Sequence, residues 1–144
     1  MELQKAIQAF YQTIIDKDVQ GIHESYIADE DTYVILEGPR LSTMGYKKIA
    51  SGWIDFCDSA ITLDDIKWIE GPFEEINGAL EWLAGVIELS VTINDKSFKN
   101  TFRSSFVLKK SNGRWKIRHE HVSGALEDPY GIGDWLKKNN NSID

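Results

Sequence analysis

The sequence predicts an α+β domain in which N-terminal helices pack on one mostly antiparallel sheet. Apolar residues recur at helical spacing near the start of the chain, whereas residues 61–123 are β-branched and aromatic runs separated by turn sequences. One further strand is expected among the helices. Hairpin turns make successive strands antiparallel, and the helices then have to cover one face of the sheet.

The helical part begins with an amphipathic segment at residues 2–16, where Leu3, Ile7, Phe10 and Ile14 share one side. Asp18 is expected to cap a short second helix, because its carboxylate can accept the amide hydrogens of a first turn. Residues 32–36 are rich in β-branched and aromatic side chains and are predicted to form a strand.

A third helix is expected to start at a Ser42 or Thr43 cap and to carry Ile49, Trp53 and Phe56 on one face. The strands that follow are predicted at residues 61–69, 79–93, 98–110 and 114–123. Gly71-Pro72 is expected to close the first of them. Residues 1–128 are therefore taken as a single domain, and residues 129–144 as a polar tail that frays.

Charge and hydropathy argue against nucleic-acid binding, membrane spanning and secretion. The formal net charge is −7, from 16 Lys and Arg against 23 Asp and Glu, and the basic clusters are only pairs, so nucleic acid is not expected as a partner. No apolar run approaches the ~20 residues that span a bilayer, and the start lacks a secretory pattern. With Cys57 as the single cysteine, a cytoplasmic protein without membrane contact is expected.

The last predicted hairpin carries a distinctive motif, Gly113-Arg114-Trp115-Lys116-Ile117-Arg118-His119-Glu120-His121-Val122-Ser123. This motif resembles the closing hairpin of SnoaL-like domains and of the calcium/calmodulin-dependent kinase II association domain. Both belong to the nuclear transport factor 2-like superfamily, as do ketosteroid isomerase-like proteins. The resemblance spans roughly residues 3–124 and implies a cone-like fold with a strongly curved sheet around a small-molecule pocket.

The register of that hairpin decides which of its side chains share a face. If Ser111-Asn112-Gly113 is a three-residue loop, Arg103 lies opposite His121, and Arg103, His119, His121 and Ser123 form one polar stripe. If Asn112-Gly113 is a two-residue turn, Arg103 moves to the other side. The first register is preferred because it gathers polar groups together, although Arg118 and Glu120 then share the apolar side.

The polar stripe suggests a binding site. Arg103 is the expected charge for a carboxylate or carbonyl ligand, with His119 or His121 as the proton carrier. The alternative is a hydrogen-bonded cluster or a dimer-interface patch. A third ligand to accompany the two histidines is not evident, so neither a metal nor a cofactor is expected. Tyr33, Trp53 and Trp82 are the expected cavity walls.

The resemblance adds one more candidate. The isomerases of the superfamily place a catalytic Asp just after the first strand, and the equivalent position in this sequence offers Glu37 as a base. The Tyr and Asp that form their oxyanion hole have no counterpart that the sequence places, so steroid isomerisation is disfavoured.

Three functions are compatible with these features. The first is a SnoaL-like domain that binds a small apolar acid or carbonyl compound. The second is an acid–base enzyme, an isomerase, cyclase or dehydratase acting next to a carbonyl, and the third is an accessory or assembly module. A homodimer is also expected, because three short helices cover one face of a sheet and leave the other unpartnered. Phe102, Phe106 and Leu108 are the apolar residues predicted for that open face.

Overall fold

The computed structural model describes residues 2–78, 80–126 and 131, and their fold is helical first and then almost entirely strand. The elements are, in chain order, α1 (Glu2–Ile15), α2 (Val19–Glu24), β1 (Tyr33–Ile35), β2 (Thr43–Met44), α3 (Tyr46–Asp58), β3 (Ile61–Glu75), β4 (Leu80–Ile93), β5 (Lys96–Ser111) and β6 (Arg114–Ser123). The predicted tail, residues 129–144, lies outside the described residues except for Gly131.

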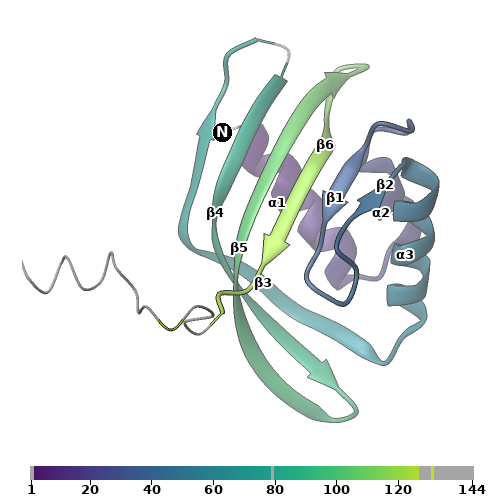
Figure 1. Ribbon diagram of the computed structural model, residues 1–144, viewed down its shortest axis with the longest axis vertical. Helices are drawn as coiled ribbons and strands as arrows, with labels where there is room; N and C mark the ends of the chain where they lie inside the picture. Colours follow the sequence, from purple (N-terminus) through teal and green to yellow (C-terminus); the bar gives the residue numbers. More distant parts are fainter. Residues whose placement is uncertain (1, 79, 127–130, 132–144) are drawn as a thin grey trace, which may run out of the picture.

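The strands form one six-stranded sheet in the order β2-β1-β6-β5-β4-β3. β1 runs parallel to β6, and every other neighbouring pair is antiparallel. Long β3, β4 and β5 curl the sheet without closing it into a barrel (Figure 1). The predicted fold class is thereby confirmed: an α+β domain with a curved, mostly antiparallel sheet.

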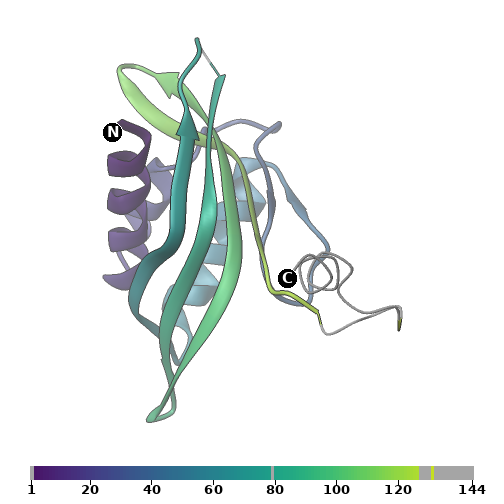
Figure 2. The same ribbon diagram turned by 90° about the vertical axis from the view of Figure 1, so that its left-hand side faces the viewer.

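The helices lie on the inner side of the curl, and α1 runs against the sheet (Figure 2). The apolar stripe of α1 supplies Leu3, Ile7, Phe10 and Ile14 to the core, and all four are buried. Asp18 caps α2 as expected, since its carboxylate accepts a hydrogen bond from the backbone nitrogen of Gly21 at 3.1 Å.

Two element boundaries differ from the prediction. The third helix, α3, has Gly45 as its N-cap instead of Ser42 or Thr43, because Thr43 pairs with β1 as part of β2. β3 continues past Gly71-Pro72 to Glu75. The ladder skips from Glu70 to Phe73, so the missing amide hydrogen of Pro72 costs no strand hydrogen bond.

The β5–β6 hairpin corrects the preferred register. Asn112-Gly113 is a two-residue turn with φ of 50° and 78°, and Ser111 pairs with Arg114. Further along, Leu108 pairs with Ile117 but Val107 pairs with His119, which leaves Arg118 as the extra residue of a β-bulge. Because of this extra residue, the side chains of β6 from His119 onward point to the face opposite the one that the two-residue turn alone would give them.

The two faces of the sheet are now assigned. Phe106 and Leu108 are buried against the helices and Phe102 packs beside them, so the prediction that these residues form the open face is wrong. The open, outer face instead carries Phe73 and Trp82, which are 58% and 43% exposed. Among the described residues, no helix is long and apolar enough to cross a membrane.

Candidate functional site

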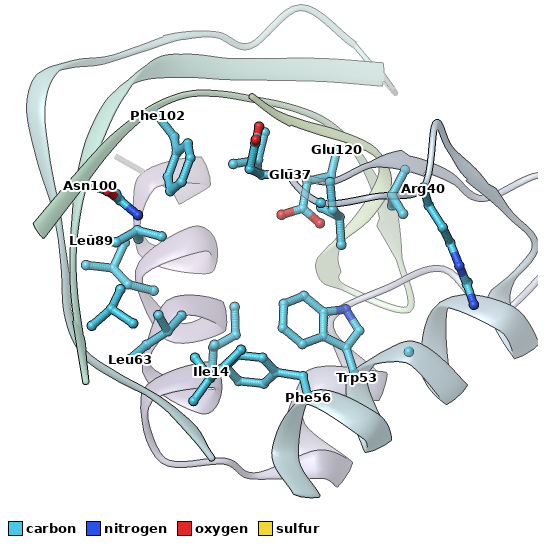
Figure 3. Close-up of a pocket in the computed structure, with 18 of the residues that line it drawn as sticks. Ile14, Glu37, Arg40, Trp53, Phe56, Leu63, Leu89, Asn100, Phe102 and Glu120 are labelled. Atoms are coloured by element: carbon cyan, nitrogen blue, oxygen red, sulfur yellow. The ribbon is translucent and has the colours of Figure 1, made fainter. Parts of the chain in front are cut away.

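A cavity of about 510 Å³ lies between the inner face of the sheet and helices α1 and α3. Ile14 of α1 and Trp53 and Phe56 of α3 form one side, and Leu89 and Phe102 of the sheet lie across from them (Figure 3). Most of the side chains that surround it are apolar. The hollow is therefore open space inside the curl, at the place where the helices do not fill it.

Glu120 is the buried polar group of this cavity. Because of the bulge at Arg118, Glu120 pairs with Phe106 and shares its inward direction. Only 2% of the residue is exposed, and its carboxyl group points into the hollow (Figure 3). The bulge residue itself is tied down, since Arg118 Nη1 donates to Asp29 Oδ1 at 2.6 Å.

Tyr26 and Trp53 form a hydrogen-bonded chain that ends on Glu120. The segment before β1 pairs with β6, as Ile117 N donates to Ser25 O and Ile27 N donates to Ile117 O, which brings Tyr26 beside β6. Tyr26 Oη then donates to Glu120 Oε1 at 2.5 Å. Trp53 Nε1 donates to Tyr26 Oη at 3.0 Å.

Burial controls the ionisation of these groups. It raises the pKa of Glu120 from 4.5 to about 7, against the smaller, opposite effect of the hydrogen bond from Tyr26. Burial, followed by the nearby Glu120 charge, also raises the pKa of Tyr26 well above its usual range. Tyr26 is therefore a fixed donor near neutral pH, whereas Glu120 can exchange a proton with a bound molecule.

Glu37 and Trp53 are the two predicted site residues that line the cavity. Glu37 follows β1, and its Oε2 accepts a hydrogen bond from Gly124 N at 2.9 Å. On the same residue, Gly124 O accepts from Arg103 Nη2 at 2.7 Å. Arg103 is thus linked to the cavity only indirectly, through the backbone of Gly124, whose amide nitrogen donates to Glu37.

The other predicted site residues lie on the outer face. Arg103 and His121 border a second hollow of about 410 Å³ with Ser105 and Ser123. The rings of Tyr33 and His119 stack with centroids 5.6 Å apart, and His119 Nδ1 lies 2.8 Å from Tyr33 O. Trp82 Nε1 donates to Glu75 Oε1 at 3.3 Å.

The structure therefore corrects the expected placement. Arg103, His119 and His121 do share a face, but the helices and the main cavity are on the opposite side of the sheet, so these residues do not form the polar end of that cavity. Tyr33 and Trp82 do not wall it either. The binding and proton-transfer roles assigned to these residues stay predictions.

Glu120 and Tyr26 were missed as site residues. The sequence did carry a signal for Glu120, because a charged residue on the apolar side of a strand is costly unless it has a function or a partner. Tyr26 offered no comparable signal, since its contact with β6 depends on chain segments that are distant in sequence.

Comparison with known proteins agrees with this fold. The family model of the SnoaL-like domain matches residues 3–127. The chain belongs to the SnoaL-like family. A search of curated proteins finds no match for this SnoaL-like domain.

Solved structures resemble the SnoaL-like domain in fold. A nuclear transport factor 2-like protein from Salmonella enterica is 21% identical with a TM-score of 0.76, over 92% of this chain and 95% of that one. A ketosteroid isomerase-like protein from Erwinia carotovora atroseptica is 14% identical with a TM-score of 0.72, over 88% and 95%. A Xanthomonas campestris protein named after the calcium/calmodulin dependent protein kinase II association domain is 16% identical with a TM-score of 0.69, over 88% and 87%. Likeness at these identities shows the fold alone.

Proposed function

We propose that the SnoaL-like domain binds a small, mainly apolar molecule in the inner cavity, with the polar end of that molecule against Glu120. The observation that carries this proposal is a hollow of about 510 Å³ whose apolar lining surrounds a buried carboxyl group. Binding sites for small molecules are typically about 300–1,000 Å³, mostly apolar, with few polar groups that fix orientation.

The geometry favours some ligands over others within the range expected from the sequence. An acid was expected because of Arg103, but Arg103 lies on the outer face, and Glu120 is the buried carboxyl group of the cavity. The basic residues of the lining, Arg40 and Lys48, are exposed. At the buried end of the cavity a carboxylate ligand would therefore meet a group of its own charge. A ligand with a hydrogen-bonding or positively charged end fits the cavity better.

Gly52 of α3 offers a direct test, because it lines the cavity and a Cβ added there meets nothing within 4 Å. N-phenylnaphthylamine, an uncharged apolar dye whose fluorescence rises in apolar surroundings, should bind the wild type and the Gly52→Ala variant equally. Gly52→Phe should weaken dye binding at least tenfold, because the ring occupies the hollow.

Gly52→Phe variants need a control for folding. Ser51→Phe places the same ring one residue away on α3, at an exposed position that does not line the cavity. It should leave dye binding unchanged. Equal dye affinity in wild type and folded Gly52→Phe, as judged by circular dichroism, would refute the proposed cavity function.

A second candidate function is acid–base catalysis next to a carbonyl. It is favoured by the pKa of about 7 at Glu120, which lets the carboxyl group take up and return a proton at neutral pH inside an apolar cavity. In this proposal Glu120 has the role that was expected of His119, His121 or Glu37.

Proton exchange at a ketone tests this second candidate. Benzylacetone in deuterated water should lose its α-protons faster with the wild type than with Glu120→Gln, as followed by proton NMR. Equal exchange rates would leave the cavity as a binding site without this chemistry.

We also propose that the domain forms a homodimer through the outer face of the sheet. Phe73 and Trp82 are large apolar residues that stand exposed on this face of β3 and β4. Burying them between two copies would remove apolar area from water. The second hollow, around Arg103 and His121, would then lie on the dimer-forming side.

A further inference from the structure

The cavity carboxyl group has donors but no counter-ion. Among the residues that the structure describes, the ion pairs join Lys67 and Lys99 to Glu88 and Arg118 to Asp29, and none involves Glu120. Buried carboxylates are usually paired with a cation, because removing an isolated charge from water is costly. Glu120, at 2% exposure, lacks that partner within the described chain.

The hydrogen bonds around Glu120 are nevertheless oriented toward a negative charge. An indole nitrogen only donates, so Tyr26 Oη must accept from Trp53 and direct its own proton to Glu120. The Tyr26–Glu120 distance of 2.5 Å falls in the range of a hydroxyl that donates to an ionised carboxylate. The site is thus arranged to hold a carboxylate whose counter-ion comes from elsewhere.

Among the described residues, none of the titratable groups around the cavity forms an ion pair with Glu120. They are Tyr11 of α1, Glu37, Arg40 and Lys48. Arg40 lies at the margin of the hollow with its guanidinium group turned away from Glu120 (Figure 3). Glu37 lies on the same side as Glu120 and, as a carboxyl group, cannot supply a cation (Figure 3). Burial raises the pKa of Tyr11, so its hydroxyl stays neutral.

Aromatic rings complete the surroundings. Trp53 and Phe56 lie across the hollow from Glu120, and Phe102 lines the hollow farther along the sheet (Figure 3). The face of an aromatic ring attracts a cation and repels an anion. A carboxyl group opposite such rings is a combination that suits a positively charged group attached to an apolar body.

We propose that the cavity takes a protonated amine carried on an apolar body, with the ammonium group ion-paired to Glu120 and the body packed against Trp53 and Phe56. This inference rests on the proposed binding function and names its ligand class. A carboxylate on the same body would be repelled, and a ketone would gain at most a hydrogen bond.

Three probes that share a phenyl ring and an alkyl chain of equal length test the inference by calorimetry: phenylbutylamine, benzylacetone and phenylbutanoate. At about pH 8, where Glu120 is ionised, the amine should bind wild type at least tenfold more tightly than either of the others. Glu120→Gln keeps an acceptor for Tyr26 and should reduce amine affinity to the level of the ketone. Glu30→Gln removes the same charge at an exposed position and should change nothing.

The pH dependence provides a second readout. Because the pKa of Glu120 is about 7, lowering the pH to about 5 neutralises the carboxyl group while an alkylamine stays protonated. Amine affinity should therefore fall by about the factor that Glu120→Gln costs at pH 8, up to about a hundredfold, and stay nearly constant in Glu120→Gln.

The outcomes separate the two proposals. Amine affinity that does not exceed that of the ketone, or that survives Glu120→Gln, overturns the amine inference; if binding of any probe is still blocked by Gly52→Phe, the cavity function stands. If neither the dye nor any probe binds in a manner that Gly52→Phe blocks, both proposals fail.

Discussion

The hydroxyl of Tyr26 lies 2.5 Å from the carboxyl group of Glu120, although the two residues are 94 positions apart in the chain. Two backbone hydrogen bonds between the Ser25–Ile27 segment and Ile117 hold this arrangement from one side. The bulge at Arg118 orients Glu120 toward Tyr26, because without the extra residue Glu120 would point to the outer face.

Tyr26→Phe should destabilise the fold by about 1–3 kcal/mol, because Glu120 loses its donor and the Trp53 indole loses its acceptor. Urea unfolding at about pH 8, where Glu120 is ionised, measures this loss. Tyr33→Phe is the matched control, since it removes the same hydroxyl from a half-buried residue on the outer face. Equal stabilities of the two variants would show that the buried chain contributes nothing.

The stability of the wild type should fall by up to about 3 kcal/mol between about pH 4.5 and 7 through Glu120 alone. In this window the carboxyl group is ionised in the unfolded chain but still protonated in the folded one. Unfolding therefore releases a proton, and rising pH favours it until the folded group also ionises near pH 7. Glu120→Gln should lack this part of the decline, as unfolding curves across the window would reveal. Parallel pH profiles for the two proteins would contradict the burial of an ionisable Glu120.

Gly85→Ala should destabilise the domain by about 1–3 kcal/mol, as overpacking does elsewhere. A Cβ at this position would lie 2.3 Å from Glu70 O and 3.0 Å from the Trp68 ring, so β3 and β4 would have to move apart. Gly52→Ala is the control in open space and should instead stabilise by about 0.5–1 kcal/mol, because alanine favours a helix. Urea unfolding should show a lower free energy of unfolding than wild type for Gly85→Ala and a higher one for Gly52→Ala.

The proposed dimer predicts that the wild type sediments as a dimer at micromolar concentration. Replacing Phe73 and Trp82 by Glu should yield a folded monomer, because charges would enter the apolar part of the outer face. Phe98→Glu is the matched control, as this exposed residue belongs to the rim of the inner cavity. A wild type that sediments as a monomer would rule the dimer out.

The fold was predictable from local sequence features. Helical periodicity located α1, the Asp18 cap located α2, and the apolar runs with their turns located β4, β5 and β6. The closing hairpin motif indicated the family, which the match over residues 3–127 confirms. These features depend on neighbours within a few positions, so one sequence contains what is needed to see them.

The inner site was not predictable in the same way. Its polar end depends on a single bulge residue, Arg118, and one residue of slip transfers every later side chain of a strand to the opposite face. Arg103, His119 and His121 were correctly grouped on one face, but which face the helices cover is decided by packing across the whole chain. Trp53 was expected as a cavity wall and Glu37 was suggested by the resemblance to the isomerases, and both line the cavity because their positions do not depend on that register.

The pKa of Glu120 is the most direct measure of the central claim, that β6 turns this carboxyl group into a mainly apolar cavity. Carbon NMR of the side-chain carboxyl, assigned by the loss of its signal in Glu120→Gln, follows the ionisation of this one group. We expect a midpoint of about 7, well above the usual 4.5, because the group is buried among apolar side chains. A midpoint near 4.5 would mean that Glu120 is in contact with water, and it would contradict the cavity site and the ligand chemistry built on it.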